Sequence, residues 1–327
     1  MKKIEQRKQE HLESVLSHNI QYSKSAGFEK VEFIHNALPE VDFEKITLSS
    51  NFLGKKINYP IVIEAMTGGF KEALKINKYL ARIAQQFNIP FGLGSQRAML
   101  ENRNDESYFV RDVAPSIPII GNIGAFQLKK HTQKDLEWMI SKVGADAIAI
   151  HLNSLQEIIQ PEGDRDFSGI LKKIEELCNS FSVPIIVKET GAGIDRRVAI
   201  KLKEAGVHYI DVAGSGGSSW SRVEYLRGNS ISGFEEWGIP TVESILECKG
   251  ILPLIASGGI RSGIDCAKSI ALGAELSGAA YPFIKTLNSG KLPRLLEEWI
   301  LQIKICCFLT GSKGIEGLKS ARIHLKT

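Results

Sequence analysis

The sequence predicts an α/β protein built as a single (β/α)8 TIM barrel with an N-terminal extension and a C-terminal helix. Eight short apolar runs follow one another from about residue 60, and segments with apolar residues at three-to-four spacing lie between them. Near-continuous apolar runs are typical of parallel strands buried on both faces. A doubly wound open sheet shares these features, but a count of eight favours the closed barrel.

Each apolar run is expected to form one barrel strand. The runs occupy residues 61–63, 89–93, 117–120, 147–150, 183–187, 209–212, 252–255 and 274–277. The helix-like segments between them occupy residues 74–87, 134–143, 169–178, 196–205, 242–247 and 264–272. We therefore expect one domain over residues 1–327, divided into an extension (1–60), the barrel (61–290) and a C-terminal helical segment (291–327).

Within the C-terminal segment, residues 293–309 are expected to form an apolar helix that contains Trp299. Two roles fit this pattern. The apolar stripe could cap the floor of the barrel, which we favour, or it could supply an interface between subunits.

Composition limits the classes of partner and compartment. The 41 basic and 37 acidic side chains give a net charge of +4, too balanced for a polyanion-binding tail, so we expect no nucleic-acid partner. No apolar run approaches the ~20 residues that span a bilayer, and the first residues lack the apolar stretch of a signal peptide. Five cysteines without zinc or disulfide-scaffold spacing favour a reducing cytoplasm.

The loops that follow the apolar runs are rich in glycine and polar residues. Barrel enzymes build their sites from the loops after the C-terminal ends of the strands, so these loops are the candidate site. In chain order they contain MTGG from residue 66, GSQR from 94, GNIG from 121, HLNSLQE from 151, KETGAG from 188, GSGGSSW from 214, SGGIR from 257 and GAA from 278.

The loop after the seventh run predicts a phosphate site. Gly258 and Gly259 allow close backbone approach just before a helix expected to begin near Ser262. Free backbone N–H groups and the helix dipole favour an anion at such a position, and barrels frequently bind phosphate after strands seven and eight. Arg261 could add a charge-assisted hydrogen bond.

Lys188, at the end of the fifth run, has three interpretations. It could be the nucleophile of a Schiff-base aldolase. It could instead lie beside a flavin and stabilise negative charge on the reduced ring. The third interpretation is a structural lysine that forms an ion pair with the adjacent Glu189.

Eight motifs together resemble the type 2 isopentenyl-diphosphate Δ-isomerases. They are RKxxH from residue 7, MTGG from 66, GSQR from 94, GNIG from 121, HLNxxQE from 151, PEGDR from 161, GGSSW from 216 and WGIPT from 237. Each is modest alone, but their order across a predicted barrel argues against chance. The resemblance implies an FMN-dependent barrel enzyme that interconverts isopentenyl and dimethylallyl diphosphate in isoprenoid biosynthesis, with NADPH as reductant, Mg²⁺, and a homotetramer or homo-octamer.

The resemblance also implies roles for individual residues. FMN would contact Ala65, Met66, Thr67, Ser95, Asn122, Lys188 and Ser218, with its phosphate on Gly259, Ile260, Arg261, Ala279 and Ala280. The diphosphate substrate would contact Arg7, Lys8, His11, Ser95, Gln96, Arg97, Asn153 and Gln156, so the N-terminal extension would contribute to the substrate site. Glu157 would bind Mg²⁺, and Gln156, His151 and Lys188 would be catalytic. Without the resemblance, Glu157 would be interpreted as a solvated residue at a helix start.

The expected reaction moves a double bond, and the substrate has no carbonyl to polarise. The barrel loops offer no strongly acidic side chain, so the hypothesis is that reduced FMN donates and accepts the proton while Lys188 tunes the ring and Gln156 orients or relays protons. One alternative is an FMN-dependent α-hydroxy-acid dehydrogenase or oxidase, which has similar phosphate loops. Another is a barrel that binds FMN as a sensor without turnover.

Overall fold

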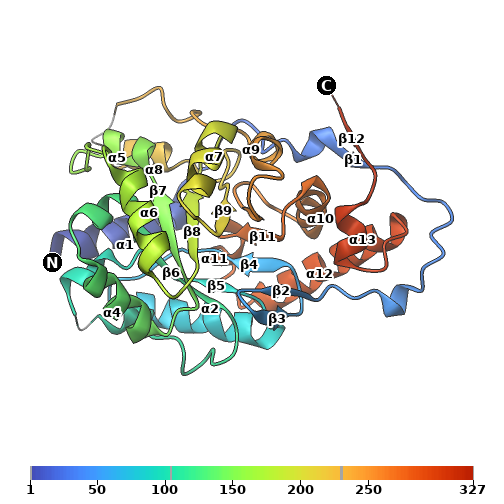
Figure 1. Ribbon diagram of the computed structural model, residues 1–327, viewed down its shortest axis with the longest axis horizontal. Helices are drawn as coiled ribbons and strands as arrows, with labels where there is room; N and C mark the ends of the chain where they lie inside the picture. Colours follow the sequence, from blue (N-terminus) through green and yellow to red (C-terminus); the bar gives the residue numbers. More distant parts are fainter. Residues whose placement is uncertain (1, 104, 229–230, 327) are drawn as a thin grey trace.

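The computed structural model describes residues 2–103, 105–228 and 231–326, and Figure 1 displays its arrangement. Eight parallel strands close into a barrel in the order β4 to β11, with β11 pairing back to β4. Their bounds are β4 Ile61–Ile63, β5 Phe91–Gly92, β6 Ile119–Gly124, β7 Ala147–Leu152, β8 Ile185–Glu189, β9 Tyr209–Asp211, β10 Leu254–Ala256 and β11 Leu276–Ala279. Each strand overlaps one predicted apolar run, and the TIM-barrel prediction is confirmed.

The helices outside the barrel match the predicted amphipathic segments (Figure 1). They are α2 Ala73–Phe87, α4 Gln133–Val143, α6 Ile170–Ser180, α7 Arg196–Glu204, α9 Thr241–Cys248 and α10 Gly263–Leu272. Local chemistry fixes their ends: α4 begins with a capping box between Thr132 and Asp135 and ends at Gly144 in the left-handed conformation. Ser262 caps α10 by accepting a hydrogen bond from the Asp265 N–H.

Short additional elements follow several strands at the C-terminal end of the barrel. They are α3 Arg97–Glu101, α5 Ser154–Ile159, α8 Trp220–Leu226, α11 Tyr281–Ile284 and the 3₁₀ turns Glu106–Tyr108 and Ala125–Lys129. Among the described residues between β5 and β6, the regular elements are α3 and the turn Glu106–Tyr108. These insertions build a wall around the mouth of the barrel, which is where the sequence places the site.

The N-terminal extension closes both ends of the barrel. The helix α1 Lys2–Ser17 packs against α8 over the mouth (Figure 1). At the opposite end, β2 Ser50–Phe52 and β3 Lys55–Ile57 form an antiparallel hairpin. Phe52 and Ile57 are fully buried there, and the Phe52 ring packs edge-on against Tyr209 at 5.2 Å between centroids.

The C-terminal helix α12 Leu292–Leu309 lies beside the barrel. It packs against α10, and Trp299 stacks on Phe283 at 5.0 Å between ring centroids. The expectation that this helix caps the floor is therefore wrong, because the hairpin β2–β3 occupies that position. The helix also follows β11 as a barrel helix would, so the barrel's last helix extends past the expected boundary at residue 290.

The C-terminal strand pairs with the N-terminal extension beside the barrel. The strand β12 Ile323–Leu325 pairs antiparallel with β1 Val31–Phe33. The remaining elements are α13 Ile315–Lys319 and the 3₁₀ turns Phe28–Lys30 and Phe43–Lys45. Across residues 2–103, 105–228 and 231–326, no helix has the length and apolar character needed to cross a membrane.

Candidate active site

A cavity of about 290 Å³ lies at the C-terminal ends of the barrel strands, below α1. Its volume is near the lower end of the range for small-molecule sites. Loops after all eight strands contribute to its wall, together with residues of α1, α5 and α8. Every residue that the sequence assigned to cofactor, substrate, metal or catalysis lines this cavity, except Gln96.

Gln96 lies behind the wall of the cavity. Its side chain is fully buried, and its amide oxygen accepts a hydrogen bond from the Asn122 backbone N–H at 2.9 Å. Its amide nitrogen points to the Met99 sulfur at 3.5 Å. This placement differs from the expected substrate contact: Gln96 acts on the site by fixing the backbone that carries Asn122.

A glycine-lined cradle occupies one side of the cavity. Gly258 and Gly259 have φ angles of 93° and 71°, a conformation that favours glycine. A Cβ atom on Gly258 would lie 2.1 Å from the Gly214 oxygen, and one on Gly217 would lie 2.5 Å from the Gly259 nitrogen. The two loops therefore approach at backbone distance just before Ser262 caps α10, and this arrangement fits a phosphate group.

Gln21 connects the cradle to the next loop. Its amide nitrogen donates to the Ser218 hydroxyl at 3.2 Å, and its amide oxygen accepts from the Arg261 guanidinium. Arg261 also donates to the Ile260 carbonyl at 3.0 Å. Sequence analysis did not single out Gln21, because a lone glutamine outside a strand-end loop carries no pattern.

Three cations line the other side of the cavity. The Lys8 ammonium donates to the Ser95 carbonyl at 2.7 Å and to the Tyr108 hydroxyl at 2.8 Å. Burial, together with the neighbouring Arg7 and Arg97, lowers the pKa of Lys8 to about 7. The buried Nε of Arg7 has no hydrogen-bond partner among the described residues. Arg97 forms an ion pair with Glu101 at 2.8 Å, whereas no ion pair forms to Arg7 or Lys8 among the described residues. A bound diphosphate would supply the anion that Arg7 and Lys8 lack.

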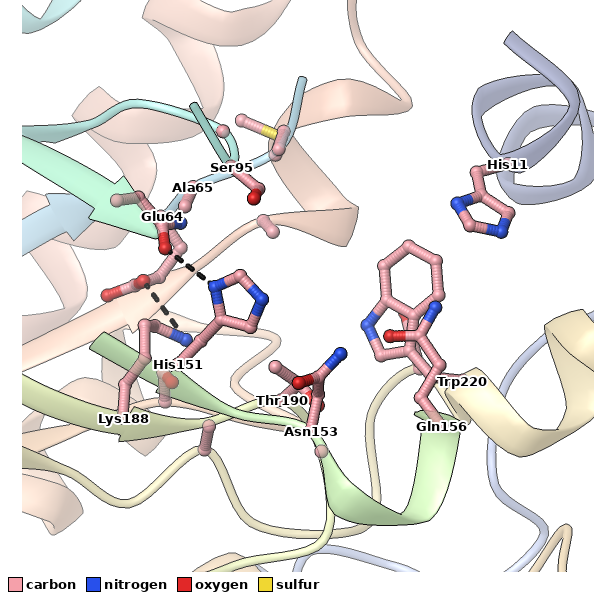
Figure 2. A pocket seen from close by; sticks show the side chains of 18 of the residues that line it. His11, Glu64, Ala65, Ser95, His151, Asn153, Gln156, Lys188, Thr190 and Trp220 are labelled. Atoms are coloured by element: carbon pink, nitrogen blue, oxygen red, sulfur yellow. Dashed lines mark hydrogen bonds and ion pairs between the residues drawn. The ribbon is translucent and has the colours of Figure 1, made fainter. Parts of the chain in front are cut away.

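His151 is neutral in this arrangement. Its Nδ1 lies 2.9 Å from the Asn122 amide oxygen, so Nδ1 carries the hydrogen (Figure 2). Burial lowers the pKa of His151 to about 3, with further contributions from Lys188 and Lys8. The ring therefore offers the cavity an unprotonated Nε2, which can accept a hydrogen bond.

Glu224 on α8 is a fully buried carboxylate that connects three elements. It accepts hydrogen bonds from His11 at 3.0 Å, from Gln156 at 2.9 Å and from Arg227 at 2.5 Å. Burial raises the pKa of Glu224, but these partners outweigh it and lower the pKa to about 2. The sequence analysis missed this residue. The available signal was its position four residues after Trp220, which places both on one helix face.

Glu157 lies on α5 at the cavity wall. One of its carboxylate oxygens accepts from the Asn153 amide at 2.9 Å, and the other accepts from the Asp164 backbone N–H at 2.8 Å. Across the described ranges, no three His, Cys, Asp or Glu side chains gather into a metal-binding group. A single carboxylate can still hold Mg²⁺ when substrate phosphates and water supply the other ligands.

Lys188 lies at the bottom of the cavity with two carboxylates. Its ammonium is 3.9 Å from the Glu64 carboxyl group (Figure 2). It is also 3.2 Å from Asp211, and it donates to the Glu189 backbone carbonyl at 2.9 Å. Burial lowers the pKa of Lys188, but the carboxylates outweigh burial and raise it. A lysine held as a cation cannot act as a Schiff-base nucleophile. The structural interpretation expected an ion pair with Glu189, but the carboxylate partners of Lys188 are Asp211 and Glu64.

Comparisons with known proteins agree with this geometry. An isopentenyl-diphosphate delta-isomerase of Pyrococcus furiosus is 46% identical over 97% of this chain and 86% of its own length. One of Rickettsia felis is 46% identical over 98% of this chain and 96% of its own. The chain belongs to the isopentenyl-diphosphate delta-isomerase family. Residues 125–325 also match the family model described as FMN-dependent dehydrogenase, which supports FMN as the cofactor of this isomerase-family chain.

Solved structures place the fold of this isomerase-family protein among flavin enzymes. A mandelate oxidase mutant with benzaldehyde superposes with a TM-score of 0.70 at 18% identity, over 98% of this chain and 95% of its own. A mutant flavocytochrome b2 with pyruvate bound gives 0.71 at 20% identity, over 97% and 83%. At these identities the likeness concerns the fold alone.

Proposed function

We propose that this protein interconverts isopentenyl diphosphate and dimethylallyl diphosphate with FMN bound in the mouth of the barrel. One observation carries the proposal: a single cavity contains two separate candidate anion sites, the glycine cradle beside Ser262 and the cations Arg7, Lys8 and Arg97. The cradle suits the cofactor phosphate, and the cations suit a diphosphate. The space between them would hold the flavin ring and the apolar tail of the substrate.

The residues expected to hold FMN fit that role. Ala65, Met66 and Thr67 form one wall, while Asn122 and Lys188 supply polar groups from the barrel interior. Further contacts would come from Ser95, Ser218, Gly259, Ile260, Arg261, Ala279 and Ala280. When bound and reduced, FMN supplies the acid and base that add and remove protons at the alkene.

The chain's own side chains position the substrate and exclude water. Glu224 accepts from the Gln156 amide nitrogen, which fixes how Gln156 faces the cavity. His11 packs edge-on against Trp220 at 5.2 Å between ring centroids, and together they close the mouth beside Gln156. The neutral His151 accepts a hydrogen bond at Nε2 without adding a positive charge near the alkene. Asn153 holds the Glu157 carboxylate in place.

Glu157 is our candidate for binding the Mg²⁺ that would bridge to the diphosphate, and NADPH is our candidate for the reductant of the flavin. We place the enzyme in the cytoplasm, since all five cysteine thiols are free. We also expect a homotetramer or homo-octamer. The α-hydroxy-acid oxidase alternative is not favoured, because the relatives with 46% identity over nearly the whole chain are named isomerases, whereas the solved oxidase structures share only the fold.

The test is an anaerobic assay with FMN, NADPH, Mg²⁺ and isopentenyl diphosphate, in which each component is omitted in turn and dimethylallyl diphosphate is measured. Product that requires reduced flavin and Mg²⁺ would support the proposal. No product from a fully reduced, FMN-loaded enzyme would contradict it. Bleaching of the flavin by a panel of α-hydroxy acids would then favour the oxidase alternative.

Enzyme reconstituted with 5-deaza-FMN tests the acid-base role. It should bind the diphosphate substrate as well as the FMN enzyme does and lose turnover. Full turnover with this analogue would contradict the proposed role of the flavin.

A further inference from the structure

Two buried carboxyl groups flank Lys188 at the bottom of the cavity. The roles described so far do not explain one of them, Glu64, which lines the cavity. Glu64 follows β4 and is 9% exposed, whereas Asp211 on β9 is 1% exposed. The Lys188 ammonium lies between them, at 3.9 Å from Glu64 and 3.2 Å from Asp211. If all three groups were ionised, this buried cluster would carry a net charge of −1, which is costly away from water.

The two carboxyl groups have unequal partners. Asp211 accepts from the Ser257 hydroxyl at 2.6 Å and from the Ala213 backbone N–H at 3.3 Å, in addition to its contact with Lys188. Glu64 has the longer contact to Lys188, and both carboxyl groups face the same ammonium. Glu64, which has fewer hydrogen-bonding partners than Asp211, is therefore the group that would hold a proton between them.

The barrel provides dedicated room for the Glu64 side chain. A Cβ atom on Gly278 of β11 would lie 2.4 Å from a Glu64 carboxyl oxygen and 2.8 Å from its Cγ. The Glu64 carboxyl thus fills space that only a glycine on β11 leaves open. It also lies at the upper end of a small void whose wall includes Lys188 and Asp211.

We propose that Glu64 and Asp211 share one proton at neutral pH, and that Glu64 is a positioning residue that holds Lys188 beneath the flavin in a cluster without net charge. The proposal rests on the proposed function, because it is the flavin that would sense the cluster. Loss of the shared proton places a net negative charge below a cofactor that itself becomes more negative on reduction, so the reduced form is disfavoured.

The surrounding charges agree with this assignment. Burial, together with the adjacent Asp211, raises the pKa of Glu64 to about 8. His151, which faces the cluster from β7, has a pKa of about 3 and stays uncharged. Burial also raises the pKa of Glu189 on β8 to about 7, although backbone N–H groups bind its carboxylate. Because Glu189 and Lys8 of α1 titrate in the same range, the test compares variants and does not rely on one pH profile.

The first measurement is the ratio of FMN affinities in the reduced and oxidised states, for the wild type and Glu64→Gln, between pH 6 and pH 9.5. Glutamine imitates the protonated carboxyl, so the two proteins should agree at pH 6. At pH 9.5 the wild type should favour oxidised FMN about tenfold more than the variant, equal to about 30 mV in a two-electron midpoint potential. Glu176→Gln on the outer face of α6 should follow the wild type. Parallel profiles for wild type and Glu64→Gln would overturn the proposal.

The second measurement needs no flavin and separates this proposal from the proposed function. The infrared carbonyl band of a protonated carboxyl is followed in the FMN-free protein at pH 7. Part of the band should be missing in Glu64→Gln. The same part should be missing in Asp211→Asn, because Glu64 then ionises against Lys188 alone. A band of full intensity in either variant would overturn the shared proton, whereas failure of the isomerase assay would leave this spectrum unchanged.

Discussion

The two ends of the barrel are closed by the same N-terminal extension, yet in opposite ways. At the floor the β2–β3 hairpin inserts Phe52 and Ile57 into an apolar cluster, and ion pairs stay at its edge, where Lys55 lies 2.7 Å from Asp146. At the mouth α1 turns Arg7 and Lys8 toward the cavity. Apolar burial stabilises a fold, whereas buried cations without anions do so poorly. The difference indicates which end binds a ligand.

The floor should therefore affect stability and leave function intact. Phe52→Ala is expected to lower the free energy of unfolding by about 3–5 kcal/mol, because it leaves a cavity against Tyr209 and the inner strand residues. Urea unfolding measures this change, and FMN affinity at low temperature should remain within twofold. Phe52→Leu, which keeps more of the volume, should lose less. An unchanged unfolding midpoint for Phe52→Ala would remove the contrast between the two ends.

Substitution of Glu224 tests whether the charge of a buried carboxylate at the mouth of the barrel contributes to the free energy of unfolding. Its pKa is lowered to about 2 from an ordinary value of 4.5, so its stabilisation is present above pH 4.5 and is lost as pH falls toward 2. The loss amounts to about 3 kcal/mol, at 1.36 kcal/mol for each pKa unit. Glu224→Gln should be less stable than the wild type at pH 6 and converge with it near pH 2. Thermal unfolding across that range provides the measurement, and a constant gap would contradict the assignment.

At Lys8, a substitution is expected to weaken substrate binding without lowering the stability of the fold. Lys8→Met keeps an apolar stem and removes a buried cation, so the KM for the diphosphate should rise about 100-fold, while stability stays equal or increases. Tyr108 still donates to the Ser95 carbonyl at 2.6 Å, so that acceptor stays satisfied. Steady-state kinetics with urea unfolding checks both halves of the expectation. Lys71→Met, at an exposed position, serves as the control.

The smallest expected effect concerns the cofactor cradle. Gln21→Ala removes the link between Ser218 and Arg261, so FMN affinity should fall roughly 2–10-fold, the effect of a lost hydrogen bond that only positions its neighbours. Fluorescence titration of the FMN-free protein measures it. Gln133→Ala on α4 is the matched control. A drop of several hundredfold would mean that Gln21 does more than hold its neighbours.

Much of this architecture was accessible from sequence because barrel strands and helices follow local rules. The eight apolar runs identified the strands. The glycines at 258 and 259 predicted a phosphate site where the structure has a glycine-lined cradle, and the family motifs added the remaining cavity residues. Gln96 was the exception among them. Its motif is correct, but no pattern tells whether a side chain after a strand faces the cavity or the layer behind it.

The missed residues are those whose role depends on distant partners. Glu224 meets His11 only because α1 folds over the mouth, and Glu64 meets Asp211 only when the barrel closes. Asp211 did offer a signal: a carboxylate inside an otherwise apolar run needs a buried partner. The floor hairpin also escaped prediction, because each strand has only three residues and Phe52 and Ile57 leave little pattern.

The space that Gly278 leaves for Glu64 restricts which substitutions these two positions can accept during evolution. The Cβ atom of an alanine at position 278 would lie 2.4 Å from a Glu64 carboxyl oxygen and 2.8 Å from a Val62 methyl carbon, so both side chains would have to shift or become shorter. The two positions are far apart in the chain and are expected to change together among relatives. Their joint identity is then a marker for which family members carry a carboxyl group below the flavin and which do not.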